Sequence, residues 1–217
     1  MARKILFLFL AVISSVFLAN ISVAWADQWE SVGQSDGVDV YRMQVQGSPM
    51  LAFRGEVVAD VHISKIMEVF TNSEERGRWV DRYHSHETLE QTNRTELYWI
   101  RFSLPPGISD RDYLLRANLE VDEEAKTVTA RLRSVVDRRW PEQGCCVRAY
   151  TETFYEFEAL SGNRTRMVVE VHTDPKGRLP AWLVNRIQRG WPSTTLSNLI
   201  ARAKAPEIES HSEYKDW

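Results

Sequence analysis

Most of the chain between residues 85 and 173 alternates apolar and polar side chains, which is the pattern of β-strands with one buried face. Short turn-forming sequences such as Ser161-Gly162-Asn163 interrupt the pattern. Two earlier segments alternate in the same way and are joined at Gly47-Ser48-Pro49. The pattern therefore predicts strands over residues 38–45, 51–58, 85–92, 95–104, 111–122, 126–137, 146–159 and 163–173.

The period changes to that of a helix in three places. Residues 63–70 carry one apolar stripe at helical spacing, and residues 71–79 read as a second, short helix. The longest helix covers 180–204, and Gly190 and Pro192 should kink it because a proline nitrogen cannot donate a helical hydrogen bond. A run of strands followed by one long helix predicts an α+β fold, with a curved antiparallel sheet wrapped against that helix.

Residues 1–26 have the composition of an export signal. Two basic residues precede a long apolar run, and Ala24-Trp25-Ala26 is a small-x-small cleavage site. An uncleaved anchor is the alternative, because about 20 apolar residues can span a bilayer. We expect cleavage after Ala26 and a location in the periplasm or outside the cell.

The rest of the chain is long enough for one domain with a hydrophobic core. We expect that domain over residues 27–204, followed by a polar tail over 205–217 that is frayed. Loss of two basic residues with the signal leaves 25 basic against 30 acidic residues, a net charge of −5. This charge argues against a nucleic-acid-binding protein, which should carry a basic face.

The two cysteines of the chain, Cys145 and Cys146, are neighbours. Exported proteins meet oxidising conditions, so a disulfide must be considered. Adjacent Cα atoms, however, lie about 3.8 Å apart, which is closer than the usual disulfide span. We therefore expect two reduced thiols in a strand, with a strained vicinal disulfide as the alternative.

The sequence lacks the motifs that would indicate catalysis. G-x-S-x-G, H-E-x-x-H, C-x-x-C and a Gly-rich phosphate loop are all absent. His84-Ser85-His86 could place two imidazoles on one side of a strand, but no third ligand is nearby. We expect no catalytic residue, no metal and no cofactor.

Several predicted strands carry small or weakly polar residues at inward positions in mid-strand. Protein interiors are packed to a density of about 0.75, so such a face needs something large opposite it. One filler is the long helix, with Trp182 and Trp191 as bulky side chains. The other is an apolar ligand in a cavity whose hydroxyl groups fix its orientation. The pattern alone leaves both open. The small inward residues are Ala117, Ala130, Ser134, Ala149, Thr151 and Thr153.

Three stretches resemble segments of the START domain, the lipid-transfer domain named for the steroidogenic acute regulatory protein. They are LPPGISDRDYLLR from Leu104, RGRWVDRY over 76–83, and RLPAWLVNRIQRGWPSTTLSNLIARA from Arg178. The resemblance spans residues 28–204. It implies a helix-grip fold, in which the sheet wraps around the last helix and an apolar tunnel lies between them.

The resemblance favours a cavity over a filled core and implies that the loop PPGISDRD lies at the tunnel mouth. We expect a gate there, formed by Pro106, Gly107 and Asp110 and by a hinge of the last helix at Pro192; a solvated turn without a gating role is the alternative. The residues expected to contact the ligand are Phe102, Leu115, Ala117, Ala130, Ser134, Thr151, Thr153, Met167, Val169, Ile187 and Trp191.

This sequence departs from the pattern of the sterol-binding members of the family in one respect. Some sterol-binding members of the family bury an acidic–basic pair in the tunnel, with the basic residue on the inner face of the sixth strand. Alternation puts Ala117 at that position here and turns Arg116 outward, and Glu96 has no evident partner. A sterol assignment is therefore not supported.

The expected function is that of a non-enzymatic, exported carrier of one apolar molecule, such as a phospholipid, a fatty acid or a sterol. We expect a monomer that contacts membranes transiently and binds no nucleic acid. Burial at about 0.8 kcal/mol per CH₂ would supply the affinity. One alternative is an enzyme of the helix-grip superfamily, a cyclase or hydrolase, which needs an inward acid or base with a displaced pKa. Another is an interaction module with a filled core that docks a membrane-protein partner.

Overall fold

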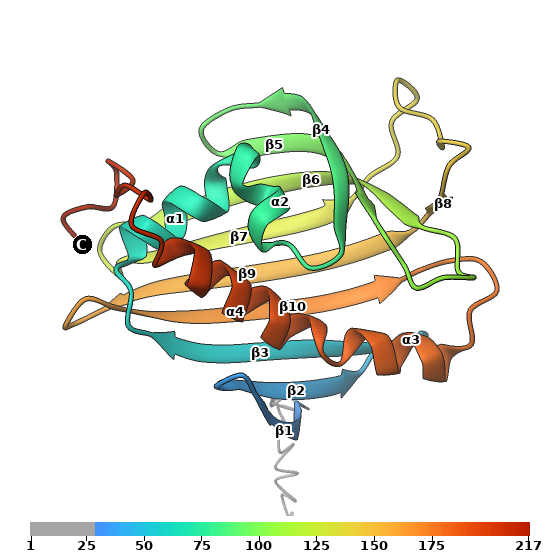
Figure 1. Cartoon of the computed structure of the whole chain (residues 1–217), viewed down its shortest axis with the longest axis horizontal. Helices are drawn as coiled ribbons and strands as arrows, with labels where there is room; N and C mark the ends of the chain where they lie inside the picture. Colours follow the sequence, from blue (N-terminus) through green and yellow to red (C-terminus); the bar gives the residue numbers. More distant parts are fainter. Residues whose placement is uncertain (1–28) are drawn as a thin grey trace, which may run out of the picture.

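A ten-stranded sheet curves around the helices of the protein (Figure 1). The computed structural model describes residues 29–217, so the expected signal peptide lies outside the described residues. The strand order is β1-β2-β3-β10-β9-β7-β6-β5-β4, all antiparallel, and the short β8 pairs with β6 in parallel. The strands are β1 (Glu30–Ser35), β2 (Val38–Gln44), β3 (Leu51–Ala59), β4 (Tyr83–Gln91), β5 (Thr95–Phe102), β6 (Arg111–Asp122), β7 (Thr127–Ser134), β8 (Val147–Arg148), β9 (Tyr150–Leu160) and β10 (Arg164–Asp174). The helices are α1 (Ile63–Thr71), the 3₁₀ turn η1 (Ser73–Glu75), α2 (Arg76–Trp79), α3 (Ala181–Gln188) and α4 (Trp191–Ala203).

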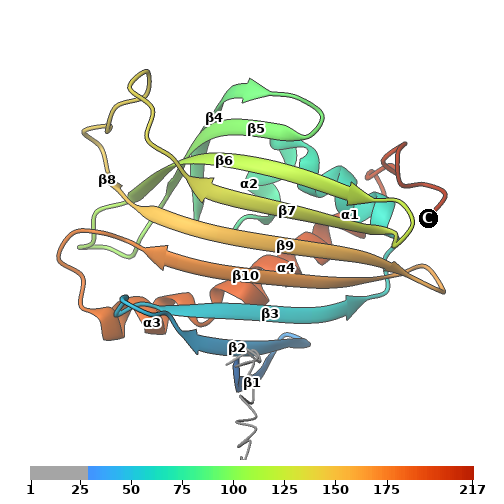
Figure 2. The same ribbon diagram turned by 180° about the vertical axis from the view of Figure 1, so that it is seen from behind.

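Alternation sorts the two faces of the sheet as predicted. In β10, Met167 and Val169 are fully buried on the concave face. Arg166 points the other way and forms ion pairs with Glu56 and Glu156 on the neighbouring strands, at 2.8 and 2.9 Å. The concave face therefore holds the core and receives the helices. The convex face carries ion pairs, and none of the helices α1 to α4 covers it, as the view from behind shows (Figure 2).

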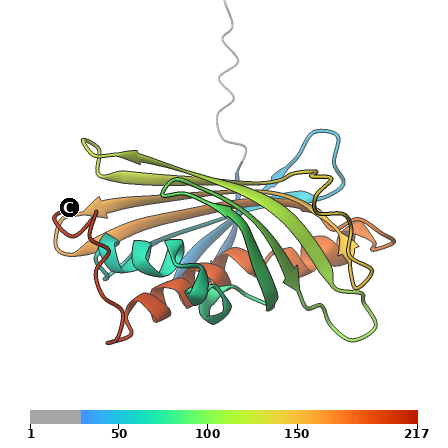
Figure 3. The ribbon, with the colours of Figure 1, turned by 90° about the horizontal axis from the view of Figure 1, so that it is seen from above.

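The helices divide the concave face between them. Seen from above, the sheet arches over α1, α2 and α4 (Figure 3). The apolar stripe predicted for α1 is buried, with Ile63, Ile66 and Met67 fully inaccessible. Together with residues of α4, these side chains fill one core cluster against β9 and β10. The α+β, helix-grip architecture expected from the sequence is confirmed.

The long C-terminal helix expected from the sequence is two helices. It breaks at Arg189 and Gly190, and Pro192 lies in the first turn of α4. A proline is tolerated there because the amide it lacks would have no helical partner. A Cβ atom built on Gly55 of β3 would come within 2.8 Å of the Pro192 Cβ atom, so α4 rests directly on the sheet.

Strand β1 was not predicted from the sequence. Its residues, Glu30–Ser35, include no run of alternating apolar side chains, and most of them are exposed. It forms because the turn at Asp36 and Gly37 folds it back on β2, with both residues at positive φ. Such a turn matches the strand twist of a hairpin.

The two cysteines correct a second expectation. Cys145 and Cys146 lie in a turn before β8 and not in a strand, and they are joined by a disulfide. In a strand, neighbouring side chains would point to opposite faces of the sheet. The turn removes that constraint, so the expectation of two reduced thiols is wrong.

Residues 205–217 are packed against the domain, and the expectation of a frayed tail is wrong. Ile208 and Tyr214 are 6 % and 0 % exposed and belong to the main core cluster. The His211 amide donates to the Ser64 carbonyl at 3.1 Å. Two buried side chains thus anchor a segment whose composition is polar. We call this segment the strap; it ends at the C-terminus marked in Figure 1.

Candidate functional site

A cavity of about 770 Å³ lies between the concave face of the sheet and the helices. This is within the range of pockets that enclose small molecules. Strands β5, β6, β7 and β9 supply most of one wall, and α2, α3 and the start of α4 supply the other. The apolar lining includes Ile100, Leu115, Leu132, Tyr155, Val184 and Ile187.

Eight of the eleven residues expected to contact a ligand line this cavity. Met167 and Val169 do not, because α1 and α4 pack over β10 and bury both side chains in the core. Ser134 ends β7, where its hydroxyl accepts a hydrogen bond from the Thr151 amide at 2.9 Å. The lining residues are Phe102, Leu115, Ala117, Ala130, Thr151, Thr153, Ile187 and Trp191.

The concave face of the sheet therefore has a part that is filled by helix side chains and a part that borders a cavity. Under α4 the concave face is packed solid by helix side chains, and Met167 belongs to that part. Further along the sheet, over Ala117 and Ala130, the face borders the cavity. Trp191 stands at the boundary, since it packs on the core cluster and also lines the cavity. The void beside Trp191 does not favour the filled-core interaction module.

A buried ion pair forms part of the cavity wall. The Arg76 guanidinium of α2 lies 2.6 Å from the Glu96 carboxylate of β5, and the two side chains are only 8 % and 12 % exposed. The guanidinium also lies 4.1 Å from the centre of the Tyr98 ring, a cation–π geometry. Thr88 donates a further hydrogen bond to Glu96 at 2.9 Å. The pair therefore has partners on several sides.

The partner of Glu96 was missed in the sequence. Arg76 lies 20 residues earlier, in a four-residue helix whose contacts depend on how the chain folds back over β5. The quoted stretch RGRWVDRY contains Arg76, but nothing local indicated which of its arginines turns inward. The basic member of the pair comes from α2, whereas the expected position on β6 holds Ala117, which lines the cavity.

Burial fixes the protonation of the aromatic hydroxyl groups in the wall. It raises the pKa of Tyr98 to about 12 and raises the pKa of Tyr113 and of Tyr155 as well. Burial would by itself lower the pKa of Arg76, but Tyr98 and Glu96 outweigh it, so the pKa is raised. At neutral pH the cavity thus presents protonated phenols, which can donate hydrogen bonds, and a charged guanidinium.

One end of the cavity, which we call the mouth, is closed by loops and by α3. Its lining residues include Phe102, Leu104, Leu179 and Val184. Arg111 ties the closing loops together, because its guanidinium donates to the carbonyl groups of Ser109, Pro175 and Lys176. This role of Arg111 was not predicted, because two of its three carbonyl partners lie 64 and 65 residues later in the chain.

The residues expected to form a gate lie near the mouth but do not line the cavity. Pro106 and Gly107 are exposed at the tip of the loop, where Gly107 has a φ of +89° that suits glycine. Asp110 holds the loop through an ion pair with Arg101 at 2.6 Å and accepts a hydrogen bond from the Leu104 amide at 3.2 Å. Pro192 is buried against β3. A gating role for these four residues stays a prediction.

A row of hydroxyl and amide groups also faces the mouth half of the cavity. The Thr151 and Thr173 hydroxyl groups lie 2.8 Å apart. The Gln188 amide donates to the Thr173 carbonyl at 3.2 Å, while its buried oxygen has no hydrogen-bond partner among the described residues. That oxygen is free to accept a hydrogen bond from a ligand.

Two negative findings bear on the chemistry. Within residues 29–217, no group of three or more His, Cys, Asp or Glu side chains is arranged to hold a metal ion. No helix in the same range is long and apolar enough to cross a membrane.

Comparison with known proteins gives a consistent result. A family model described as the START domain matches residues 18–202. The phosphatidylcholine transfer protein of Bos taurus is 25 % identical over 177 residues, covering 79 % of this chain and 82 % of that protein. An uncharacterized protein of Pseudomonas aeruginosa is 23 % identical over 181 residues, covering 83 % and 89 %.

Solved structures show the same fold. A STAR-related lipid transfer protein from Xanthomonas axonopodis superposes with a TM-score of 0.75 at 24 % identity, covering 82 % of this chain and all of that one. The human StAR-related lipid transfer protein 5 gives a TM-score of 0.76 at 20 % identity, with coverage of 82 % and 88 %.

Proposed function

The chain belongs to the START domain family, and from this premise we propose that it is an exported carrier that holds one lipid in its cavity. The observation that supports this most directly is the cavity of about 770 Å³, which is apolar over most of its wall and has a buried ion pair at one side. An apolar chain gains about 0.8 kcal/mol per buried CH₂ in such a cavity.

A phospholipid is the ligand that we propose. Two charges that leave water cost several kcal/mol each, so a buried ion pair is a costly way to line a site for a purely apolar molecule. A zwitterionic headgroup could exchange contacts with Arg76 and Glu96 and accept hydrogen bonds from nearby phenols such as Tyr98. Related chains named as phosphatidylcholine transfer proteins are consistent with this choice.

We propose a role in binding and transfer rather than catalysis. The arginine and the carboxylate in the wall are bound to each other, and the neighbouring phenols are protonated at neutral pH. Neither arrangement provides a nucleophile with an adjacent general base, which hydrolysis would require. A cyclase or hydrolase is therefore the less favoured alternative.

We further propose that α3 is the surface that contacts membranes. Trp182 is 66 % exposed, and Arg186, also exposed, follows it at i+4 on the same helix face. Arg189 follows directly after the helix and donates to the Val32 carbonyl at 2.8 Å. No acidic residue occurs between Pro175 and Pro206. An exposed tryptophan beside an exposed arginine, in a segment without acidic residues, suits the interface of an anionic membrane. The opposite face of α3, with Val184, lines the cavity. The protein would approach the membrane as a monomer, from the periplasm or the extracellular side.

Native mass spectrometry of the protein from its own host compartment tests the proposed function. We expect one phospholipid per chain and uptake of a fluorescent phosphatidylcholine. Ala130→Trp should abolish uptake by filling the cavity, whereas Val58→Trp, on a side chain that is 47 % exposed, should not. A protein without bound lipid that also takes up no fluorescent lipid would contradict the proposal.

A further inference from the structure

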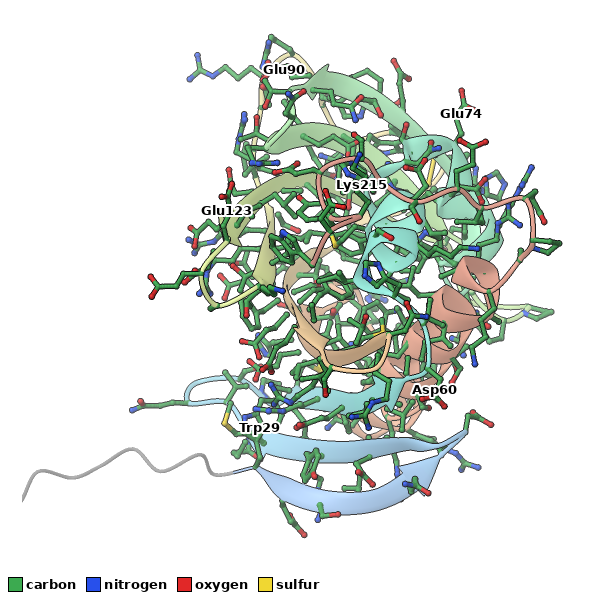
Figure 4. The ribbon with its side chains drawn as sticks, turned by 90° about the vertical axis from the view of Figure 1, so that its left-hand side faces the viewer. Trp29, Asp60, Glu74, Glu90, Glu123 and Lys215 are labelled. Carbon is green, nitrogen blue, oxygen red and sulfur yellow. A yellow bond between two sulfur atoms is a disulfide. The ribbon has the colours of Figure 1, made fainter. Side chains whose placement is uncertain are left out.

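The cavity continues to the end of the molecule opposite the mouth. There its lining passes from Glu96 to the β4–β5 turn, with Asn93 and Arg94, and to strap residues Glu213 and Tyr214. Figure 4 looks onto this end, where Lys215 marks the strap beside α1. The strap thus forms part of the cavity wall, although it follows the last helix.

An ion pair joins the strap to the sheet at this point. Both terminal nitrogens of Arg94 donate to the Glu213 carboxylate, one of them at 3.0 Å. The Arg94 carbonyl accepts a hydrogen bond from the Leu119 amide at 2.7 Å, so the arginine is held on the sheet. The Glu213 side chain belongs to the strap and is 32 % exposed. One partner is therefore fixed, and the other moves with the strap.

Tyr214 stands directly behind this ion pair. Its side chain is completely buried, lines the cavity and packs edge-on against Trp217. The hydroxyl lies close to Arg94 and Glu213, whose charges influence its pKa, but it forms no hydrogen bond of normal geometry with the described residues. An unpaired buried hydroxyl is unfavourable. The buried hydroxyl therefore makes the closed position of Tyr214 less stable, although its ring separates the cavity from solvent.

We propose that the strap, Ala205–Trp217, closes a second mouth of the cavity, and that the Arg94–Glu213 pair is the latch that must break before a ligand can leave through it. The inference rests on the proposed function, since it concerns the same cavity. It differs from the predicted gate in position and in chemistry. The latch is an ion pair between partly exposed side chains, which opens more easily than a packed core.

Charge reversal tests the latch. The probe is a phosphatidylcholine with a fluorescent acyl chain, released from the protein into unlabelled phosphatidylcholine vesicles. Arg94→Glu and Glu213→Arg each place like charges together, and each should speed release by about two- to fivefold. The double reversal restores opposite charges and should return the rate to that of the wild type.

A second ion pair provides the matched control. Arg42 and Glu30 form the same two-bonded arrangement on β1 and β2, at 2.9 and 3.0 Å and away from the cavity. Reversing either residue should leave the release rate unchanged. If Glu213→Arg does not fold, as judged by circular dichroism, Glu213→Gln should show a smaller increase in the same direction.

The outcomes separate this inference from the proposed function. A wild type that takes up no lipid overturns both. A wild type that binds lipid, with single reversals that release it at the wild-type rate, overturns the latch alone. The same holds if the control reversals speed release equally, or if the double reversal fails to restore the rate.

Discussion

The two ends of the cavity are closed by different kinds of interaction. At the mouth, Arg111 donates to three backbone carbonyl groups and so fixes two loops through their main chains. At the strap end, the closing contact joins two side chains, Arg94 and Glu213. The residues that line the cavity at the mouth include apolar ones such as Leu104, whereas those at the strap end include the charged residues Arg94 and Glu213.

This difference bears on what each end can do. A donor buried among carbonyl groups holds a loop in one conformation, and it is shielded from dissolved salt. A partly exposed ion pair holds less firmly and responds to salt and pH. We therefore expect the contacts of Arg111 to hold the mouth regardless of salt, and the strap end to be the more sensitive of the two to salt.

The largest effect is expected for Arg76, which lies between the two ends. Arg76→Leu leaves the Glu96 carboxylate buried without its partner, which should lower the free energy of unfolding by about 3–5 kcal/mol. The double variant with Glu96→Leu should recover most of that loss. Urea unfolding measures both; equal stability of the single and double variants would contradict the role of the pair.

The second largest effect is expected for substitution of Arg111 at the mouth. Arg111→Met removes the donor to three carbonyl groups and should cost about 2–3 kcal/mol. It should also speed lipid release, because the loops before α3 and after β5 lose their common anchor. Arg42→Met, on the exposed pair with Glu30, should lower the stability far less, because an exposed ion pair contributes little. If the two variants behave alike in urea unfolding and lipid release, the mouth is not held by Arg111.

Acid should loosen both ends, in a window set by their carboxylates. The hydrogen bond from Arg101 and that from the Leu104 amide hold the pKa of Asp110 below its usual value, and Arg94 lowers that of Glu213. A carboxyl group whose pKa is lower in the folded protein stabilises the fold at pH values above its unfolded pKa, which is about 3.9 for Asp and 4.3 for Glu. This stabilisation is lost as the pH falls through the pKa of the folded state. Lipid release should therefore be flat from pH 7 to about pH 5 and rise below about pH 4. A rise centred near pH 6 would point to histidine instead.

The smallest effect is that of salt. An increase from about 0.1 to 1 M shortens the Debye length from about 10 to 3 Å, which weakens the exposed latch and leaves the contacts of Arg111 nearly unchanged. Release from the wild type should rise by less than about fivefold. The variant Arg94→Glu, which has no attractive latch left to screen, should not show this rise. An equal salt dependence in both proteins would argue against the comparison.

The sequence was most informative where structure is local. Alternation located most strands to within a few residues, because each strand shows its two faces in its own side chains. It missed β1, and it read β8 and β9 as one strand over 146–159. It could not separate Met167 from Ala117, since both point to the concave face and only the position of the helices buries Met167 in the core and leaves Ala117 beside the cavity. The pairing of Arg76 with Glu96 and the docking of Tyr214 are likewise contacts between distant segments, which period and composition do not record.

Within residues 29–217 the sheet is open and has two edge strands, β1 and β4, whose backbone groups could pair with another chain. Both edges are irregular. The register shifts between Ser31 and Gly33 in β1, and it shifts twice in β4, near Ser85 and near Glu90. Such bulges bend a strand away from the straight geometry that a second sheet would extend. The open sheet thus has edges that are poorly suited to edge-to-edge aggregation.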